Sequence, residues 1–177
     1  MRILGWLVNL SLRGVIAAVL VDALRRPNDP RYRDKAIGPR GLVMIPASLL
    51  FPVAQLHPAR KRRPYPVGVD NLYLSIFALD LAGNYFDLYD RFMYFDAIPH
   101  AHGTGAFTVA AAELLDLPPL SAVGVAQLGH IGLEAQEYYS DVLFDLRNVR
   151  GTWDTVNDLL AGAVGSVLYA ALLPRRR

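Results

Sequence analysis

The 177-residue chain contains no cysteine. It therefore has no disulfide framework, no thiolate nucleophile and no cysteine-ligated zinc site. Charged residues are sparse, at 19% of the chain, whereas 53% of the residues are hydrophobic, which is high for a soluble protein. The two-residue alternation of apolar and polar residues that marks a half-buried strand is also missing. These absences leave an all-α, strongly apolar protein as the expected class.

Apolar runs recur along the chain, each bounded by proline, glycine or charge. They cover residues 3–24, 41–56, 70–88, 97–115, 120–144 and 152–173. A spanning helix needs about 20 mainly apolar residues. The second run is too short and contains Pro46 and Pro52, so we expect a re-entrant or interfacial segment there. The sequence predicts a single membrane-embedded domain over residues 1–177, with five spanning helices plus that segment, or with six spans.

Basic residues are segregated from acidic ones and set the expected orientation. Most of the 18 lysines and arginines lie in residues 25–40, 60–63 and 175–177. Lys and Arg mark cytoplasmic loops, and all three places are cytoplasmic only if the second run does not cross the membrane. Five spans are therefore favoured, although both topologies put the C-terminus in the cytoplasm. Because these charges adjoin apolar runs, we expect contact with membrane lipid and not with nucleic acid. We expect the first run to be kept as a helix and not cleaved as a signal peptide.

Acidic residues gather at the helix ends that should meet at the opposite, extracytoplasmic face. Because successive spans alternate in direction, the ends of the third and fifth runs meet the starts of the fourth and sixth. The acids at these ends are Asp80, Asp87, Asp90, Asp96, Glu134, Glu137, Asp141, Asp145, Asp154 and Asp158. Arginines that are candidates to pair with some of them are Arg13, Arg91, Arg147 and Arg150. One polar pocket among the last four runs is the expected result.

Spacing within each run supports this pocket, because residues three, four or seven apart share a helix face. The sets with such spacing are Asp80, Asn84 and Asp87; Asp96 and His100; Glu134, Glu137 and Asp141; and Asp154 and Asp158. A carboxylate facing lipid would cost at least ~2.5 kcal/mol near mid-bilayer, so these faces should look inward. The small residues Ala161 and Gly165 continue the Asp158 face and permit close helix packing.

Carboxylates this close together need protons or cations between them. Asp, Glu and His suit Mg²⁺, Mn²⁺, Ca²⁺ or Zn²⁺, so the expected ligands of a divalent metal ion are Asp96, His100, Glu134, Glu137, Asp154 and Asp158. With a carboxylate as general base, the candidate catalytic residues are Asp96, His100, Glu134, Glu137 and Asp158. Candidates for substrate contact or support of the ligands are Asp80, Asn84, Asp87, Arg150 and Trp153. Simpler roles stay open: helix N-terminal acids for Asp96 and Asp154, and hydrogen-bonded bridges for Asp80 and Asn84.

Three segments within residues 87–173 resemble a known group of proteins. They are Phe95-Asp96-Ala97-Ile98-Pro99-His100 with Gly103, Leu133-Glu134-Ala135-Gln136-Glu137, and Gly151-Thr152-Trp153-Asp154-Thr155-Val156-Asn157-Asp158 with Gly162 and Gly165. Their order and spacing resemble the VanZ-like and YjdF-like bacterial membrane proteins. This resemblance implies a multi-pass protein of the bacterial cytoplasmic membrane. The association of the VanZ-like group with glycopeptide resistance implies the cell envelope, but no reaction.

Three functions fit these observations. The first is a carboxylate-rich, divalent-cation-binding pocket, open to the outer leaflet, that acts on a lipid-linked or amphipathic envelope substrate. The second is a proton- or cation-coupled transporter in which the same acids titrate; its few spans and lack of an inverted repeat would favour a homo-oligomer. The third is a non-catalytic membrane adaptor. Whether the chain is an enzyme is left open by its sequence.

Overall fold

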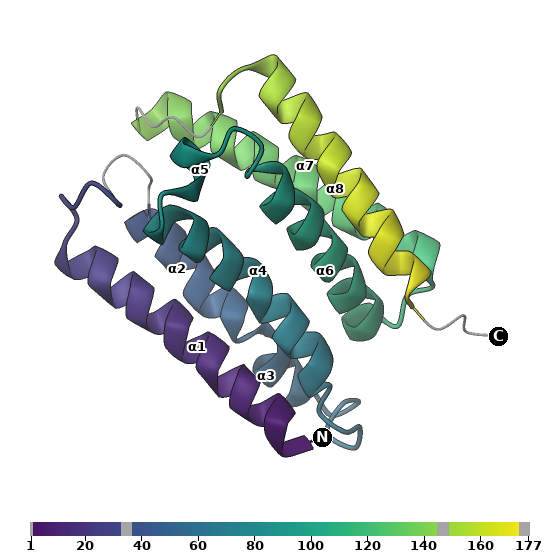
Figure 1. Cartoon of the computed structure of the whole chain (residues 1–177). Helices are drawn as coiled ribbons and strands as arrows, with labels where there is room; N and C mark the ends of the chain where they lie inside the picture. Colours follow the sequence, from purple (N-terminus) through teal and green to yellow (C-terminus); the bar gives the residue numbers. More distant parts are fainter. Residues whose placement is uncertain (1, 33–36, 145–148, 174–177) are drawn as a thin grey trace. The chain divides into compact units, whose positions relative to one another are not determined.

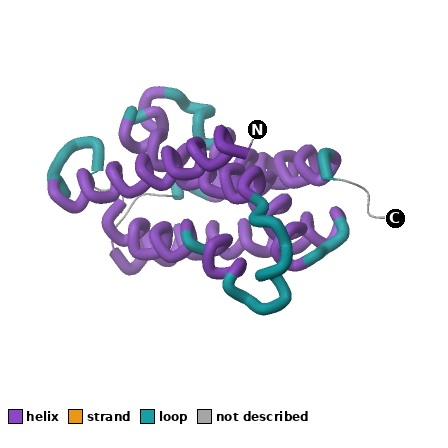
Figure 2. The backbone as a smooth tube through the Cα atoms, turned by 90° about the horizontal axis from the view of Figure 1, so that it is seen from below, coloured by secondary structure: helices purple, strands orange, loops and turns teal. Residues whose placement is uncertain are grey.

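A computed structural model describes residues 2–32, 37–144 and 149–173. Within these ranges the chain is helical and has no strand (Figure 2). It divides into two compact units, residues 1–85 and 86–177, and each is described by itself. The single domain expected over residues 1–177 stays a prediction. Asp145, Arg147 and the three C-terminal arginines, which entered the predictions above, lie outside the described residues.

The first unit contains α1 (Arg2–Arg25), α2 (Ile37–Ser48), α3 (Leu50–Gln55) and α4 (Val67–Tyr85). α1 packs along α4 and also contacts α2 (Figure 1). The buried residues of their shared core are Ile16, Leu20, Ala23, Tyr32, Ile37, Leu74 and Leu81. The second apolar run is broken at Leu49 into two short helices. Pro52 explains part of this break, because proline has no N–H with which to continue the helical hydrogen bonds.

A buried polar cluster joins α1 to α4 inside this unit. Arg13 Nη2 lies 2.7 Å from Asp70 Oδ2, and the Asp70 side chain is completely buried. The same carboxylate oxygen accepts hydrogen bonds from Asn9 Nδ2 at 2.8 Å and from the Tyr65 hydroxyl at 2.5 Å. Arg13 also donates to the carbonyl oxygen of Ser48, the group that a residue with an N–H at position 52 would have bonded in a continuous helix. The expectation that Arg13 pairs with an acid of the polar pocket is wrong; its partner is Asp70.

The second unit contains α5 (Leu88–Arg91), α6 (Ala97–Leu115), α7 (Pro119–Phe144) and α8 (Thr152–Ala171). α6 packs on both α7 and α8, and these two also contact each other (Figure 1). The last three helices match the apolar runs at residues 97–115, 120–144 and 152–173 to within two residues. Their boundaries were predictable because each run ends at charge, glycine or proline.

Glycine lets α6 and α8 approach until their backbones touch. A Cβ atom added to Gly165 would lie 1.8 Å from the carbonyl oxygen of Ala101, and one added to Gly105 would lie 2.5 Å from the ring of Tyr169. Neither position has room for a methyl group. The close packing predicted for the Gly165 face is therefore confirmed. It sets the spacing of the two helices that carry His100 and Asp158.

One described helix is long and apolar enough to cross a membrane. It covers Ile3–Arg25. Its most apolar 18-residue stretch has a mean hydropathy of 1.9, and only 17% of that stretch is buried. The five-span bundle expected from the sequence is not confirmed by this measure. The helices of the second unit have lengths close to a bilayer crossing, with 19 residues in α6, 26 in α7 and 20 in α8, but they carry more polar groups.

Candidate metal centre

Polar side chains from three helices of the second unit converge at one place between them. His100 lies one turn into α6, His130 and Glu134 lie one turn apart on α7, and Asp158 lies in the second turn of α8. Asp96 precedes the first residue of α6 and faces His100 across one turn. Each helix contributes through one face. On α6 and α7 the two polar residues are four positions apart, and α8 contributes Asp158 alone.

Three potential ligand atoms surround one point on the Nδ1 side of His100. His100 Nδ1 lies 2.8 Å from His130 Nε2 and 3.6 Å from Glu134 Oε1. The distance from His130 Nε2 to Glu134 Oε1 is 3.4 Å. Around a tetrahedral zinc ion with Zn–N bonds of 2.0–2.1 Å, ligand atoms lie roughly 3.3 Å apart. The two distances to Glu134 are close to this spacing, whereas the 2.8 Å between the ring nitrogens is a hydrogen-bond distance that would lengthen by about 0.5 Å around an ion. The three atoms are close enough together to hold one metal ion.

Two carboxylates lie on the other side of the same imidazole ring. His100 Nε2 is 3.5 Å from Asp96 Oδ1 and 3.8 Å from Asp158 Oδ1. These three atoms form a second group compact enough for a metal ion. His100 therefore belongs to both groups and presents a different ring nitrogen to each.

The groups are buried, and some of their atoms have no hydrogen-bond partner among the described residues. Glu134 is 6% exposed and His130 is 4% exposed, and neither Glu134 Oε1 nor His130 Nδ1 has a hydrogen bond. Buried polar atoms without partners are costly and rare in native proteins. Glu134 Oε1 faces both histidines, so a cation at that point would satisfy it.

Gly162 of α8 makes room for the His130 ring. A Cβ atom at this position would lie 2.1 Å from His130 Nδ1 and 2.7 Å from Thr104 Oγ1. The ring therefore packs directly against the α8 backbone. This contact holds the imidazole with Nε2 toward His100 and Glu134.

His130 was not predicted from the sequence, although a signal for it was present. It precedes Glu134 by four residues and so shares its helix face, but the prediction was built on acidic residues alone. His102, two residues after His100, lies elsewhere and its Nδ1 is 2.8 Å from the Tyr169 hydroxyl. Of the predicted ligands, the structure brings together Asp96, His100, Glu134 and Asp158.

Both acids for which a simpler role was left open do lie at the start of a helix. Asp96 occupies the N-cap position of α6 but makes no side-chain capping hydrogen bond; it faces His100 instead. Asp154, in the first turn of α8, reaches back and accepts the backbone N–H of Arg150 at 2.9 Å, a contact similar to that of the acid in a capping box. Asp154 does not belong to either ligand group, and Trp153 beside it is 79% exposed. Arg150 donates its Nη2 group to the carbonyl oxygen of Tyr89 at 3.2 Å.

The remaining predicted residues take other positions. Asp80 and Asn84 belong to the first unit, where Asp80 Oδ1 pairs with Arg40 Nη1 at 3.1 Å and Asn84 Nδ2 donates to the Asp80 carbonyl at 2.9 Å. Asp87 begins the short helix α5 with a left-handed backbone, φ 59°. Glu137 is half-buried on α7, one turn beyond Glu134, and interacts electrostatically with His100. It lies outside both ligand groups.

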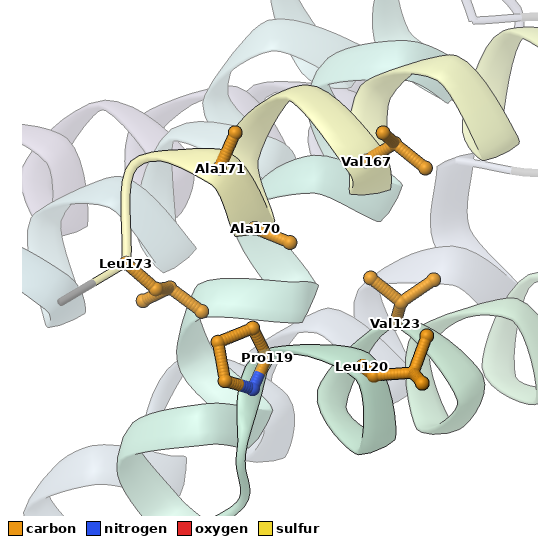
Figure 3. A pocket seen from close by; sticks show the side chains of 7 residues that line it. All are labelled: Pro119, Leu120, Val123, Val167, Ala170, Ala171 and Leu173. Atoms are coloured by element: carbon orange, nitrogen blue, oxygen red, sulfur yellow. The ribbon is translucent and has the colours of Figure 1, made fainter. Parts of the chain in front are cut away.

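An apolar groove of about 370 Å³ lies between the start of α7 and the end of α8 (Figure 3). Its lining residues are Pro119, Leu120, Val123, Val167, Ala170, Ala171 and Leu173. None of these side chains can ligate a metal or transfer a proton. The groove is therefore not the chemical site, which lies further along the same two helices.

No family model, curated protein or solved structure matches this chain. The resemblance to VanZ-like and YjdF-like membrane proteins therefore stays a prediction.

Proposed function

We propose that this chain is a multi-pass protein of a bacterial cytoplasmic membrane that binds a divalent metal ion through His100, His130 and Glu134. The observation that carries the proposal is the buried, unbonded Glu134 oxygen facing two imidazole nitrogens at 3.4 and 3.6 Å. Two histidines and one glutamate form a known catalytic zinc set, which leaves a fourth position open. The charge of the three side chains and the two distances from Glu134 to the imidazole nitrogens fit such an ion.

The membrane part of the proposal rests on the outer faces of the helices. Large apolar side chains are exposed along α1, α7 and α8, for example Ile3 at 79%, Leu128 at 71% and Leu168 at 61%. Exposed apolar patches of this extent are uncommon on soluble monomers, whereas lipid would cover them. In the proposed topology α1, α4, α6, α7 and α8 span the membrane, and α2 with α3 forms the interfacial or re-entrant segment.

The absence of cysteine allows this topology to be tested without removing native thiols. Single cysteines replacing Lys61 and Met93, both exposed, should react with a membrane-impermeant maleimide from the cytoplasmic and the outer side, respectively. A cysteine replacing Asn28 should react from the cytoplasmic side if there are five spans and from the outer side if there are six. Membrane association itself is checked by an alkaline carbonate wash. Release of the chain without detergent would contradict the proposal.

A metal ion held in this way would lower the pKa of a bound water to about 7 and act as a Lewis acid, which suits hydrolysis of an ester or phosphoester. The chain's own residues would hold and orient the ion. Asp96 and Asp158 flank His100 Nε2 and so fix which ring nitrogen faces the ligand group. Glu137, one turn beyond Glu134 and in electrostatic interaction with His100, would be the general base. In a membrane, the substrate class would be a lipid-linked or amphipathic envelope molecule.

A proton-coupled transporter is the second candidate, and one observation favours it. Asp96, His100, His130 and Glu134 form a continuous series with steps of 3.5, 2.8 and 3.4 Å. The middle step is a hydrogen-bond distance, and the two outer steps would have to shorten by a few tenths of an ångström for direct proton transfer. The transporter predicts proton-coupled flux in liposomes by a metal-free protein, whereas the metal-site proposal predicts that activity requires the ion.

Zinc binding by the purified full-length chain tests the leading proposal. His130→Ala and Glu134→Gln should each weaken one equivalent of bound Zn²⁺ on the order of 100-fold or more, since even supporting residues change metal affinity by 10–100-fold. His102→Ala is a matched control, because this histidine lies on the same helix, two residues after His100, but forms a hydrogen bond with the Tyr169 hydroxyl. Unchanged zinc content in both site variants, measured by elemental analysis and equilibrium dialysis, would overturn the proposal.

A further inference from the structure

We infer that Asp96, Asp158 and the Nε2 atom of His100 form a second divalent-cation site, which shares the His100 imidazole with the first. The inference deepens the proposed function and rests on it for the first ion. Its basis is the group of Asp96 Oδ1, His100 Nε2 and Asp158 Oδ1, whose atoms all lie within 4.8 Å of one another.

Two carboxylates at one ring nitrogen are more than orientation of the ring requires. A metal-bound histidine normally donates its other N–H to one carboxylate or carbonyl oxygen. Here Nε2 has Asp96 at 3.5 Å and Asp158 at 3.8 Å, and one N–H can satisfy only one of them. The other carboxylate needs a different partner.

Asp158 makes the longer of the two contacts with His100 Nε2. Its side chain is 9% exposed, and no hydrogen bond to it is found among the described residues. No Lys or Arg of the described chain lies within salt-bridge distance of Asp96, Asp158 or Glu134. The basic side chain beside Asp158 is His100, whose Nε2 atom also faces Asp96, so one imidazole would have to serve two carboxylates. A nine-tenths-buried charge that is not fully paired is strongly disfavoured. A divalent cation between Asp158, Asp96 and His100 Nε2 would neutralise both carboxylates.

Binding of the second ion requires one proton to leave the ring. The N–H bond at His100 Nε2 breaks, the proton passes to the solvent, and Nε2 binds the second cation while Nδ1 holds the first. The ring then carries one negative charge between two divalent ions. Carboxylate and imidazole ligands together suit Zn²⁺ or Mn²⁺.

Zn²⁺ titration of the purified full-length protein, followed by elemental analysis after dialysis, tests the inference. The wild-type chain should hold two equivalents, and Asp158→Asn or Asp96→Asn should hold one. Asp154→Asn is the matched control on α8 and should hold two, since that carboxylate bonds the Arg150 backbone. Circular dichroism checks that each variant is folded; Asp96, at 22% exposed, should tolerate the change even if Asp158 does not.

The failures of the two proposals are distinguishable. One equivalent in the wild-type chain, lost in Glu134→Gln but kept in Asp96→Asn and Asp158→Asn, would overturn the second site and leave the first. If the wild-type chain held two equivalents of Zn²⁺ and both Glu134→Gln and His130→Ala also held two, the first site would be overturned. If the imidazole is shared, His100→Ala should lose both equivalents of Zn²⁺, whereas each of the other site variants should lose one.

Discussion

Replacing Arg13 with leucine is expected to lower the free energy of unfolding by about 3–5 kcal/mol, the usual cost of removing one partner of a buried ion pair. Asp70 is completely buried and receives Arg13 Nη2 at 2.7 Å. Without the guanidinium its charge would keep only the Asn9 and Tyr65 donors, and Asp70 Oδ1 already has no hydrogen bond within the described chain. The change also leaves the Ser48 carbonyl without its Arg13 donor.

The measurement is unfolding of the purified chain in mixed detergent micelles, followed by circular dichroism. Arg26→Leu is the control, because Arg26 pairs with Asp22 at 3.3 Å but is 63% exposed, and exposed pairs contribute less than about 1 kcal/mol. The double variant Arg13→Met/Asp70→Asn should recover much of the loss, since it removes both charges. Equal stabilities for Arg13→Leu and Arg26→Leu would contradict the assignment of this pair as a buried anchor of α1.

The helices were largely predictable, because their apolar runs end at strong local signals. α6 begins and ends where its run does, and α7 and α8 differ by at most two residues. The prolines of the second run led to the prediction of a re-entrant or interfacial segment, but the break into two helices at Leu49 was not predicted. Whether these helices form a five-span bundle depends on the lipid surroundings and on topology, which local signals do not determine.

The site was predicted only in part, because contacts within one helix leave a pattern in the sequence and contacts between distant segments do not. Spacings of four residues placed Asp96 with His100, and alternating helix directions brought them to Glu134 and Asp158. His130 was missed because the prediction followed acidic residues and did not extend the Glu134 face by one turn. Pairs such as Asp80 with Arg40, 40 residues apart, depend on how α2 packs against α4. Such packing has no short-range signature, and neither has the pair of Arg13 with Asp70.

Gly165→Ala should destabilise the second unit by about 3 kcal/mol or more, at or above the upper end of the usual cost of overpacking. The added methyl group would meet the Ala101 carbonyl oxygen at 1.8 Å. This atom belongs to the backbone of α6, so no side-chain rotation relieves the contact and the two helices must separate. Separation would move His100 and Asp96 away from Asp158, so cation binding at the shared histidine should weaken together with stability.

Gly124→Ala and Gly132→Ala are the matched controls, since a Cβ atom at either position of α7 meets nothing within 4 Å. In a helix, exchange of glycine for alanine without a clash stabilises by up to about 1 kcal/mol. The controls should therefore shift the unfolding midpoint in the opposite direction from Gly165→Ala, with unchanged zinc binding. If Gly165→Ala behaved like these controls, α6 and α8 would not be in backbone contact. The distance from His100 to Asp158, on which the second cation site depends, would then have to be larger than 3.8 Å.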